Sequence, residues 1–244
     1  SSRIVDCVFQ NIYALHCGGA ILNAGSPCAP VIANCTFWDN SSSSGGGGIY
    51  NNYHASPSIV NCTFWNNAKI DSEGVYTNHR GGGIDNYNSS PKVFNCILYD
   101  NFPQDIWDYY SSPDISYCNI KQGYPGTGNF SLDPQFLNPG SGDFHLKPVS
   151  PCIDSGTNGK LPIWLTEDFE GDSRIVNDMV DMGIDETSYQ TPVVVTNAAT
   201  NISASSADLS GAVIDIGGEE SLTVSIIWGT NTGGPYLFES NTLI

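Results

Sequence analysis

Basic residues are scarce in this sequence. Its 244 residues include only 8 Lys and Arg against 25 Asp and Glu, which gives a formal net charge of −17. A protein that binds nucleic acid needs a basic footprint, so this class is excluded. Attraction to an anionic membrane surface is disfavoured for the same reason.

Long apolar runs and helical patterns are missing as well. No stretch approaches the roughly 20 apolar residues that cross a bilayer, so we expect no membrane span. No window carries apolar residues at the i, i+3, i+4, i+7 positions of an amphipathic helix. Hydrophobic residues still make up 40% of the chain, which is enough for a core and excludes wholesale disorder.

The two ends carry few terminal signals. The sequence begins at Ser1 without an initiator Met and stops at Ile244 without a turn. We therefore expect a processed product or a piece of a longer protein.

A repeat dominates the first half of the chain. Its shared feature is a Cys, usually preceded by Asn or Asp and followed two positions later by an apolar residue. The Cys-to-Cys steps are 28, 27, 34 and 22 residues. A Pro lies five residues before each Cys after the first, and a Gly cluster opens a further short strand. The cysteines of the repeat are Cys7, Cys35, Cys62, Cys96 and Cys118.

This pattern predicts three short strands per repeat, stacked as the rungs of a parallel β-helix. A propeller blade would need four strands in about 40–45 residues. Because rungs stack at about the 4.8 Å spacing of a sheet, equivalent side chains should lie over one another. We expect an inward stack of the repeat's cysteines and a second inward stack of Phe9, Phe37, Phe64, Leu98 and Ile120. Asn34, Asn61 and Asn95 should occupy a bend, where Asn tolerates a left-handed backbone.

The residues of the repeat resemble a known family. Gly-Gly-Ile-x-Asn followed by Ser-Pro-x-Ile-x-Asn-Cys-x-Phe is similar to the right-handed parallel β-helix repeats of large bacterial surface and secreted proteins. Residues 129–186 resemble the terminal module called the choice-of-anchor Q domain, through segments 131–136, 142–146, 150–156 and 168–174. The resemblance implies a secreted or cell-surface protein. It implies no single activity, because this fold carries lyases, hydrolases, adhesins and passive stalks.

The predicted fold class is all-β, a right-handed parallel β-helix with a C-terminal cap and a partial β-sandwich. We place the rungs in residues 1–157, the cap module in 158–188 and the sandwich in 191–244. The last segment resembles the start of a fibronectin-type-III or immunoglobulin-like domain. Such a domain takes about 100 residues and seven strands, so either the chain is truncated or a partner supplies the missing strands.

The cysteines are expected to be reduced. Side chains at the same position of successive rungs point in parallel, which suits packing better than disulfide geometry. Cys152 is expected to continue the stack. Cys17 and Cys28 fall outside the repeat and flank one turn, and whether they form a disulfide is left open. No CxxC or Cys/His spacing typical of zinc occurs.

A strip of aromatic side chains is the first candidate site. Trp38, Trp65 and Tyr99 follow the inward position by one residue and should face outward, with Thr36 and Thr63 beside them. The strip could contact a glycan or another protein chain, including a second copy. Alternatively, a long loop of the same chain covers it.

Carboxylates provide the other candidates. Asp168, Glu170 and Asp172 alternate in a Gly-containing loop that could hold calcium, or that simply forms a turn of the cap. Asp71, Glu73, His79 and Arg80 gather in the insertion of the 34-residue step, as catalytic groups or as a solvated loop. We found no pair of carboxylates arranged for glycoside hydrolysis.

Two functions remain open at this stage. The first is an extracellular structural or adhesive protein, a stalk, adhesin or self-assembling fibre, that presents a β-helix flank to protein or glycan. The second is a polysaccharide lyase or glycoside hydrolase with its site in loops or in rungs outside this sequence.

Overall fold

The chain forms two separate units. The computed structural model describes residues 2–70, 80–188, 193–203, 206–215, 223–228 and 238–243. Residues 1–187 form one compact unit, and residues 188–244 form the other. Within the described ranges there is no helix long and apolar enough to cross a membrane.

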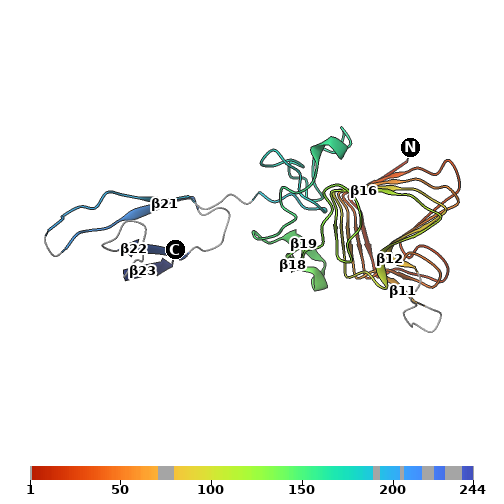
Figure 1. Cartoon of the computed structure of the whole chain (residues 1–244), viewed down its shortest axis with the longest axis horizontal. Helices are drawn as coiled ribbons and strands as arrows, with labels where there is room; N and C mark the ends of the chain where they lie inside the picture. Colours follow the sequence, from red (N-terminus) through yellow and green to blue (C-terminus); the bar gives the residue numbers. More distant parts are fainter. Residues whose placement is uncertain are drawn as a thin grey trace. The chain divides into compact units, whose positions relative to one another are not determined.

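The first unit is a parallel β-helix, which confirms the predicted fold class (Figure 1). Its strands pair in register from rung to rung and form four parallel sheets. The first sheet contains β1 (Arg3–Val5), β5 (Val31–Ala33), β9 (Ser58–Val60), β13 (Lys92–Phe94) and β16 (Asp114–Ser116). The second contains β2 (Val8–Gln10), β6 (Thr36–Trp38), β10 (Thr63–Trp65), β14 (Ile97–Tyr99) and β17 (Asn119–Ile120).

The other two sheets complete each rung. One contains the two-residue strands β3 (Tyr13–Ala14), β7 (Ser41–Ser42) and β11 (Ala68–Lys69). The other contains β4 (Ile21–Ala24), β8 (Ile49–Asn52), β12 (Gly81–Tyr87) and β15 (Gln104–Tyr109). The first three rungs therefore have four strands where the sequence predicted three. The additional strand is short and largely polar, so it carries no hydrophobic alternation.

The predicted inward stacks are present. Phe64 pairs in register with Phe37 and Leu98. The rings of Phe9 and Phe37 are stacked with centroids 4.9 Å apart, and those of Phe37 and Phe64 with centroids 4.5 Å apart. Four cysteines, Cys35, Cys62, Cys96 and Cys118, are fully buried in the same hydrophobic cluster.

Hydrogen-bonded amides line the bends between sheets. Asn34, Asn61 and Asn95 have φ values of 48°, 48° and 53°, the left-handed backbone expected for them. Two further ladders run along the stack, one at another bend and one within the strands of the β4–β8–β12–β15 sheet. In one, Asn40, Asn67, Asn101 and Asp105 are linked by side-chain hydrogen bonds of 2.8–2.9 Å. In the other, Asn23, Asn51, Asn86 and Asp108 are linked in the same way.

All eight cysteines are free thiols. The stacked cysteines are reduced as predicted, and the pair left open, Cys17 and Cys28, is not bridged. Cys152 does not continue the stack. It lies in a second hydrophobic cluster with Phe136, Phe144 and Met182, because the chain has left the β-helix by that point.

The chain after the last rung folds back against the β-helix. β18 (Phe136–Asn138) and β19 (Asp143–Leu146) form an antiparallel pair joined by a short 3-10 helix, η1 (Pro139–Ser141), and η2 (Asn158–Lys160) follows. The fully buried Arg174 donates hydrogen bonds to the carbonyl oxygens of Ile184 and Asp185 and to the carboxylate of Glu186. This buried pair fixes the C-terminal end of the module.

The second unit contains two antiparallel strand pairs. β20 (Val193–Thr196) pairs with β21 (Gly211–Asp215), and β22 (Thr223–Trp228) pairs with β23 (Phe238–Leu243). The sandwich domain and the boundaries of the cap module stay predictions.

Candidate functional sites

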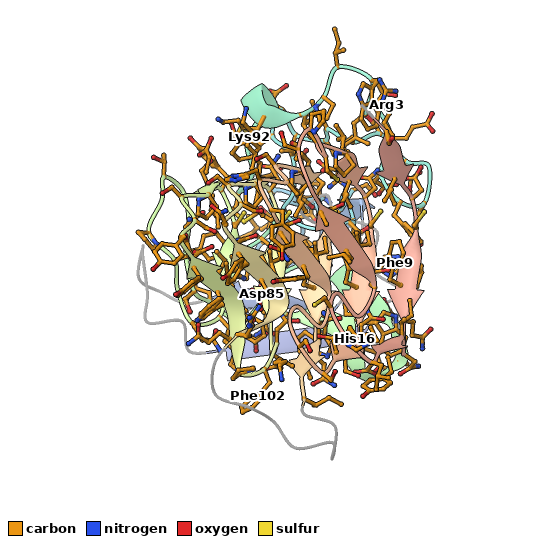
Figure 2. All side chains as sticks on the ribbon, turned by 90° about the vertical axis from the view of Figure 1, so that its right-hand side faces the viewer. Arg3, Phe9, His16, Asp85, Lys92 and Phe102 are labelled. Carbon is orange, nitrogen blue, oxygen red and sulfur yellow. The ribbon has the colours of Figure 1, made fainter. Side chains whose placement is uncertain are left out.

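A group of polar and aromatic side chains lies on the outer face of the β4–β8–β12–β15 sheet. Tyr50, Asp85 and Trp107 occupy equivalent positions on successive rungs, with Asp85 paired in register to both neighbours. Because side chains alternate along a strand and the flanking Ile84 points into the core, these three point outward. Figure 2 labels Asp85 among the side chains of the β-helix.

Arg80 completes this group just before β12. Its guanidinium lies 5.6 Å from the ring centroids of Tyr50 and Tyr87 and 5.5 Å from that of Trp107. It donates a hydrogen bond of 3.2 Å to the Tyr50 hydroxyl and lies 3.8 Å from the Asp85 carboxylate. The cation is therefore held by three aromatic rings and one carboxylate.

Asp85 is an outward side chain that is nevertheless fully buried. Within the described residues, neither carboxylate oxygen makes a hydrogen bond of normal geometry. Burial raises the pKa of Asp85 to about 7, although Arg80 and the backbone amides of Gly46 and Gly81 act to lower it. At neutral pH the Asp85 carboxyl group is therefore protonated in part of the molecules and ionised in the others.

Aromatic rings continue from this group to the edge of the sheet. Tyr109 pairs in register with Tyr87, and their rings are stacked with centroids 5.2 Å apart. The planes of Trp107 and Tyr109 differ by only 2°, with centroids 5.5 Å apart. Tyr109 and Tyr110 are 40% and 78% exposed, and β15 is the edge strand of its sheet. We call Tyr50, Tyr87, Trp107, Tyr109 and Tyr110 the aromatic flank.

The aromatic strip predicted from the sequence lies elsewhere and is covered. The Trp38 ring packs edge-on against Phe144 at 6.2 Å, and the Trp65 ring packs edge-on against Phe136 at 5.7 Å. Tyr99 stacks on Trp65 and belongs to the same cluster. Close contact at Trp38 requires a glycine, since a Cβ at Gly142 would lie 2.8 Å from a ring atom.

The two threonines beside this strip are buried as well. Thr36 and Thr63 are 3% and 0% exposed, and their hydroxyls have no hydrogen-bond partner in the part of the chain that the structure describes. The sequence left two alternatives for Trp38, Trp65, Tyr99, Thr36 and Thr63: contact with a partner, or cover by a later part of the same chain. The structure shows the second. The strip packs against the C-terminal module, which leaves its three aromatic rings partly buried.

The residues proposed for calcium separate into two environments. Asp168 is buried, and one of its oxygens accepts hydrogen bonds from the backbone N–H groups of Glu170, Gly171 and Asp172. Its other oxygen accepts the N–H of Glu186. Asp168 therefore closes a turn, while the exposed Glu170 reaches a different group of side chains.

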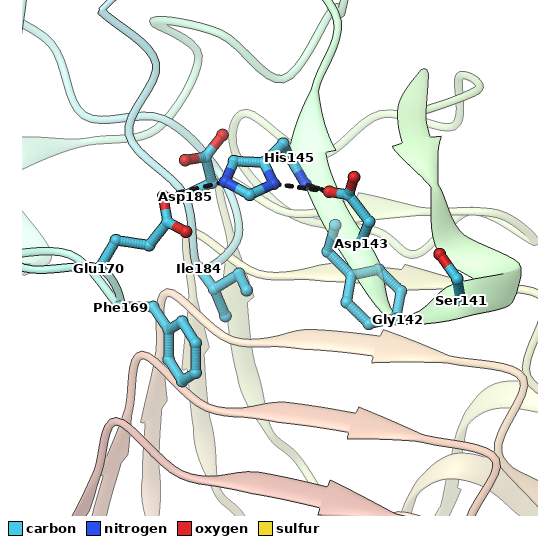
Figure 3. A pocket seen from close by; sticks show the side chains of 9 residues that line it. Ser141, Gly142, Asp143, His145, Phe169, Glu170, Ile184 and Asp185 are labelled. Carbon is cyan, nitrogen blue, oxygen red and sulfur yellow. Dashed lines mark hydrogen bonds and ion pairs between the residues drawn. The ribbon is translucent and has the colours of Figure 1, made fainter.

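That group lines a cavity of about 300 Å³ in the C-terminal module (Figure 3). His145 contacts Asp143 through Nδ1 at 2.5 Å and Glu170 through Nε2 at 2.9 Å. Burial acts to lower the pKa of His145, but the hydrogen bonds to Asp143 and Glu170 raise it to about 9. Asp185 lies beside them at the base of the cavity and accepts the N–H of Leu146.

The insertion that the sequence singled out is only partly described. Asp71, Glu73 and His79 lie outside the described residues, and Arg80 joins the aromatic flank. The sequence did contain a signal for this flank. Tyr50, Asp85 and Trp107 each follow an inward Ile by one residue, at the same place relative to the repeat.

No protein-family model, curated protein or solved structure matches this chain. Its class, an all-β parallel β-helix protein, is therefore defined by its own strand pairing and stacked core.

Proposed function

We propose that the protein is a secreted or cell-surface structural or adhesive protein that binds carbohydrate on its aromatic flank. In this proposal the β-helix is a rigid stalk, and residues 129–186 are a terminal module of the choice-of-anchor Q type. The packing of Arg174 against Glu186 is in keeping with such a module, because the last of its four segments, residues 168–174, contacts the end of the module there.

The aromatic flank is the observation that carries the proposal. Sugar rings bind proteins through stacking on aromatic faces together with hydrogen bonds from a few polar groups, which is a common arrangement in ligand sites. Trp107 and Tyr109 present nearly parallel rings, and Arg80 and Asp85 lie beside them. The net charge of −17 repels polyanions, so a neutral glycan is favoured over an acidic one.

Affinity electrophoresis of the full chain tests this function. Gels would contain mixed-linkage β-glucan, xyloglucan or galactomannan, with polygalacturonate as the acidic comparison. We expect retardation by at least one neutral polysaccharide, and its loss in Trp107→Ala and Tyr109→Ala. Tyr13→Ala is the matched control, since Tyr13 is an exposed aromatic residue on another sheet. Unchanged migration of the wild-type protein in all neutral gels would refute the proposal.

A second candidate is a carbohydrate-active enzyme, and Asp85 is the feature that favours it. A carboxyl group with a pKa of about 7 keeps part of its protons at neutral pH, as a general acid must. Because Asp85 is fully buried, a leaving group would reach it only after Arg80 moves aside. Hydrolysis would release reducing ends from a polysaccharide that the flank binds. We expect Asp85→Asn to abolish the release of reducing ends while the polysaccharide still retards the protein in the gel. If the wild type binds the polysaccharide but releases no reducing ends, the enzyme function is refuted and only the adhesive function remains.

A further inference from the structure

The cavity in the C-terminal module brings three metal-ligating side chains together. Ligand atoms of His145, Glu170 and Asp185 all lie within 4.8 Å of one another. They come from three separate segments: β19, the turn closed by Asp168, and the end of the module. The chain thus converges on one point from positions up to 40 residues apart.

The environment of this cluster favours positive charge, which the protonated His145 supplies between Asp143 and Glu170 and which a metal ion would supply after displacing the proton on Nε2. Asp143 holds Nδ1 of His145, which leaves Nε2 directed toward Glu170 and the cavity (Figure 3). A carboxylate in this position orients a histidine in many metal centres and makes it a better ligand. The side chains that line the cavity include three carboxylates and neither Lys nor Arg.

We propose that His145, Glu170 and Asp185 bind a divalent transition-metal ion, with zinc as the best fit. One imidazole nitrogen and two carboxylate oxygens are ligands that zinc accepts, and the open side of the cavity leaves a fourth position for water. Zinc holds such ligands at about 2.0–2.2 Å. Glu170 is exposed, so its side chain is able to rotate toward an ion in the cavity.

The composition of the set distinguishes zinc from calcium. Calcium takes six to eight oxygen ligands and rarely uses imidazole, whereas imidazole suits zinc, copper and nickel. Asp168, which a calcium loop would have required, is fully engaged by backbone N–H groups. The proposed ion would tie the turn at 168–172 to β19.

Calorimetric titration of the metal-stripped full chain with zinc chloride tests this site. We expect one ion per chain, and at least a hundredfold weaker binding in His145→Gln, Glu170→Gln and Asp185→Asn. Asp143→Asn should weaken binding about ten- to a hundredfold, since it only orients His145. Asp172→Asn, an exposed carboxylate in the same turn, should bind as the wild type does.

Cobalt absorption separates this site from the free thiols. Bound Co²⁺ should give visible bands without a strong thiolate charge-transfer band, and His145→Gln should remove them. Three results would overturn the proposal: no saturable zinc binding, a thiolate band that persists in His145→Gln, or unchanged affinity in Glu170→Gln. Glu170 is exposed, so its variant should fold even if Asp185→Asn does not.

Discussion

Asp85 has an environment that does not favour folding. A fully buried carboxyl group without hydrogen bonds of normal geometry costs free energy when it is ionised. Arg80, at 3.8 Å, and the backbone amides of Gly46 and Gly81 compensate only part of that cost. A local arrangement that opposes stability is most readily explained by a role in function. Asp85 therefore lowers the stability of the fold and at the same time belongs to the proposed site.

The pH dependence of stability should reflect this carboxyl group. Its pKa is raised by burial from 3.8 to about 7, so the folded state holds the proton more tightly than the unfolded state. Its stabilising contribution is complete below pH 3.8 and is lost as the pH rises through about 7. Between pH 5 and 7 we expect the free energy of unfolding of the wild type to fall by about 1–2 kcal/mol more than that of Asp85→Asn. A single titrating group can change this free energy by at most about 1.4 kcal/mol per pH unit. Urea unfolding at several pH values measures the difference.

Asp172→Asn provides the control, because it removes an exposed carboxylate and should keep the wild-type slope. A parallel pH dependence of wild type and Asp85→Asn would show that burial does not hold this proton.

At the level of elements, buried amide ladders join neighbouring rungs alongside the apolar stacks. Asn67 donates hydrogen bonds to the carbonyl oxygen of Phe37 and to Asn101, and its own oxygen accepts from Asn40. All of these groups are buried. The ladder therefore satisfies backbone groups at bends where the sheets leave them without partners.

Removing one member of a ladder should be costly. Asn67→Ala leaves several buried groups unsatisfied, and we expect it to lower the free energy of unfolding by about 2–4 kcal/mol. The neighbouring Asn66 is the matched control, since it is exposed and Asn66→Gly keeps the positive φ of 52°. Denaturant unfolding compares the two variants. An equal and small effect of both would contradict a structural role of the ladder.

The recurring residues of the repeat predicted the strands and bends of the β-helix. The candidate sites depend on contacts between segments that are far apart in the sequence. Rung period, inward stacks and bends follow from residues that recur about every 28 positions. The cover over Trp38 comes from Phe144, more than 100 residues later, and no periodicity reports it. The contact between His145 and Glu170 could not be predicted for the same reason, because it joins a strand and a turn that lie far apart in the sequence. The fourth strand of the first three rungs was missed because it has no apolar alternation.

On the scale of the whole molecule, the β-helix is a column in which each rung contacts only its neighbours. Such a column opens most easily where its core is least buried. Cys7, in the first rung, is half-buried, whereas Cys62 and Cys96 lie fully buried in the middle. Burial also raises the pKa of the Cys62 and Cys96 thiols well above its usual range, which lowers their reactivity further.

Alkylation of the native protein with iodoacetamide should therefore follow position in the column. We expect Cys7 to be modified well before Cys62 and Cys96, which should react only as the column opens. Mass spectrometry of peptides at successive times gives the order. Modification of Cys62 at the rate of Cys7 would be incompatible with a stacked core in native conditions.

We propose the outer face of β8, β12 and β15 as the carbohydrate-binding surface. Hydrogen–deuterium exchange of the full chain, with and without each neutral polysaccharide, tests it most directly. The account predicts slower exchange in residues 80–87 and 104–110 when glycan is bound, with residues 36–38 and 63–65 unchanged. Slower exchange at those last two segments, or no change within 80–110 for a polysaccharide that retards the protein, would contradict it.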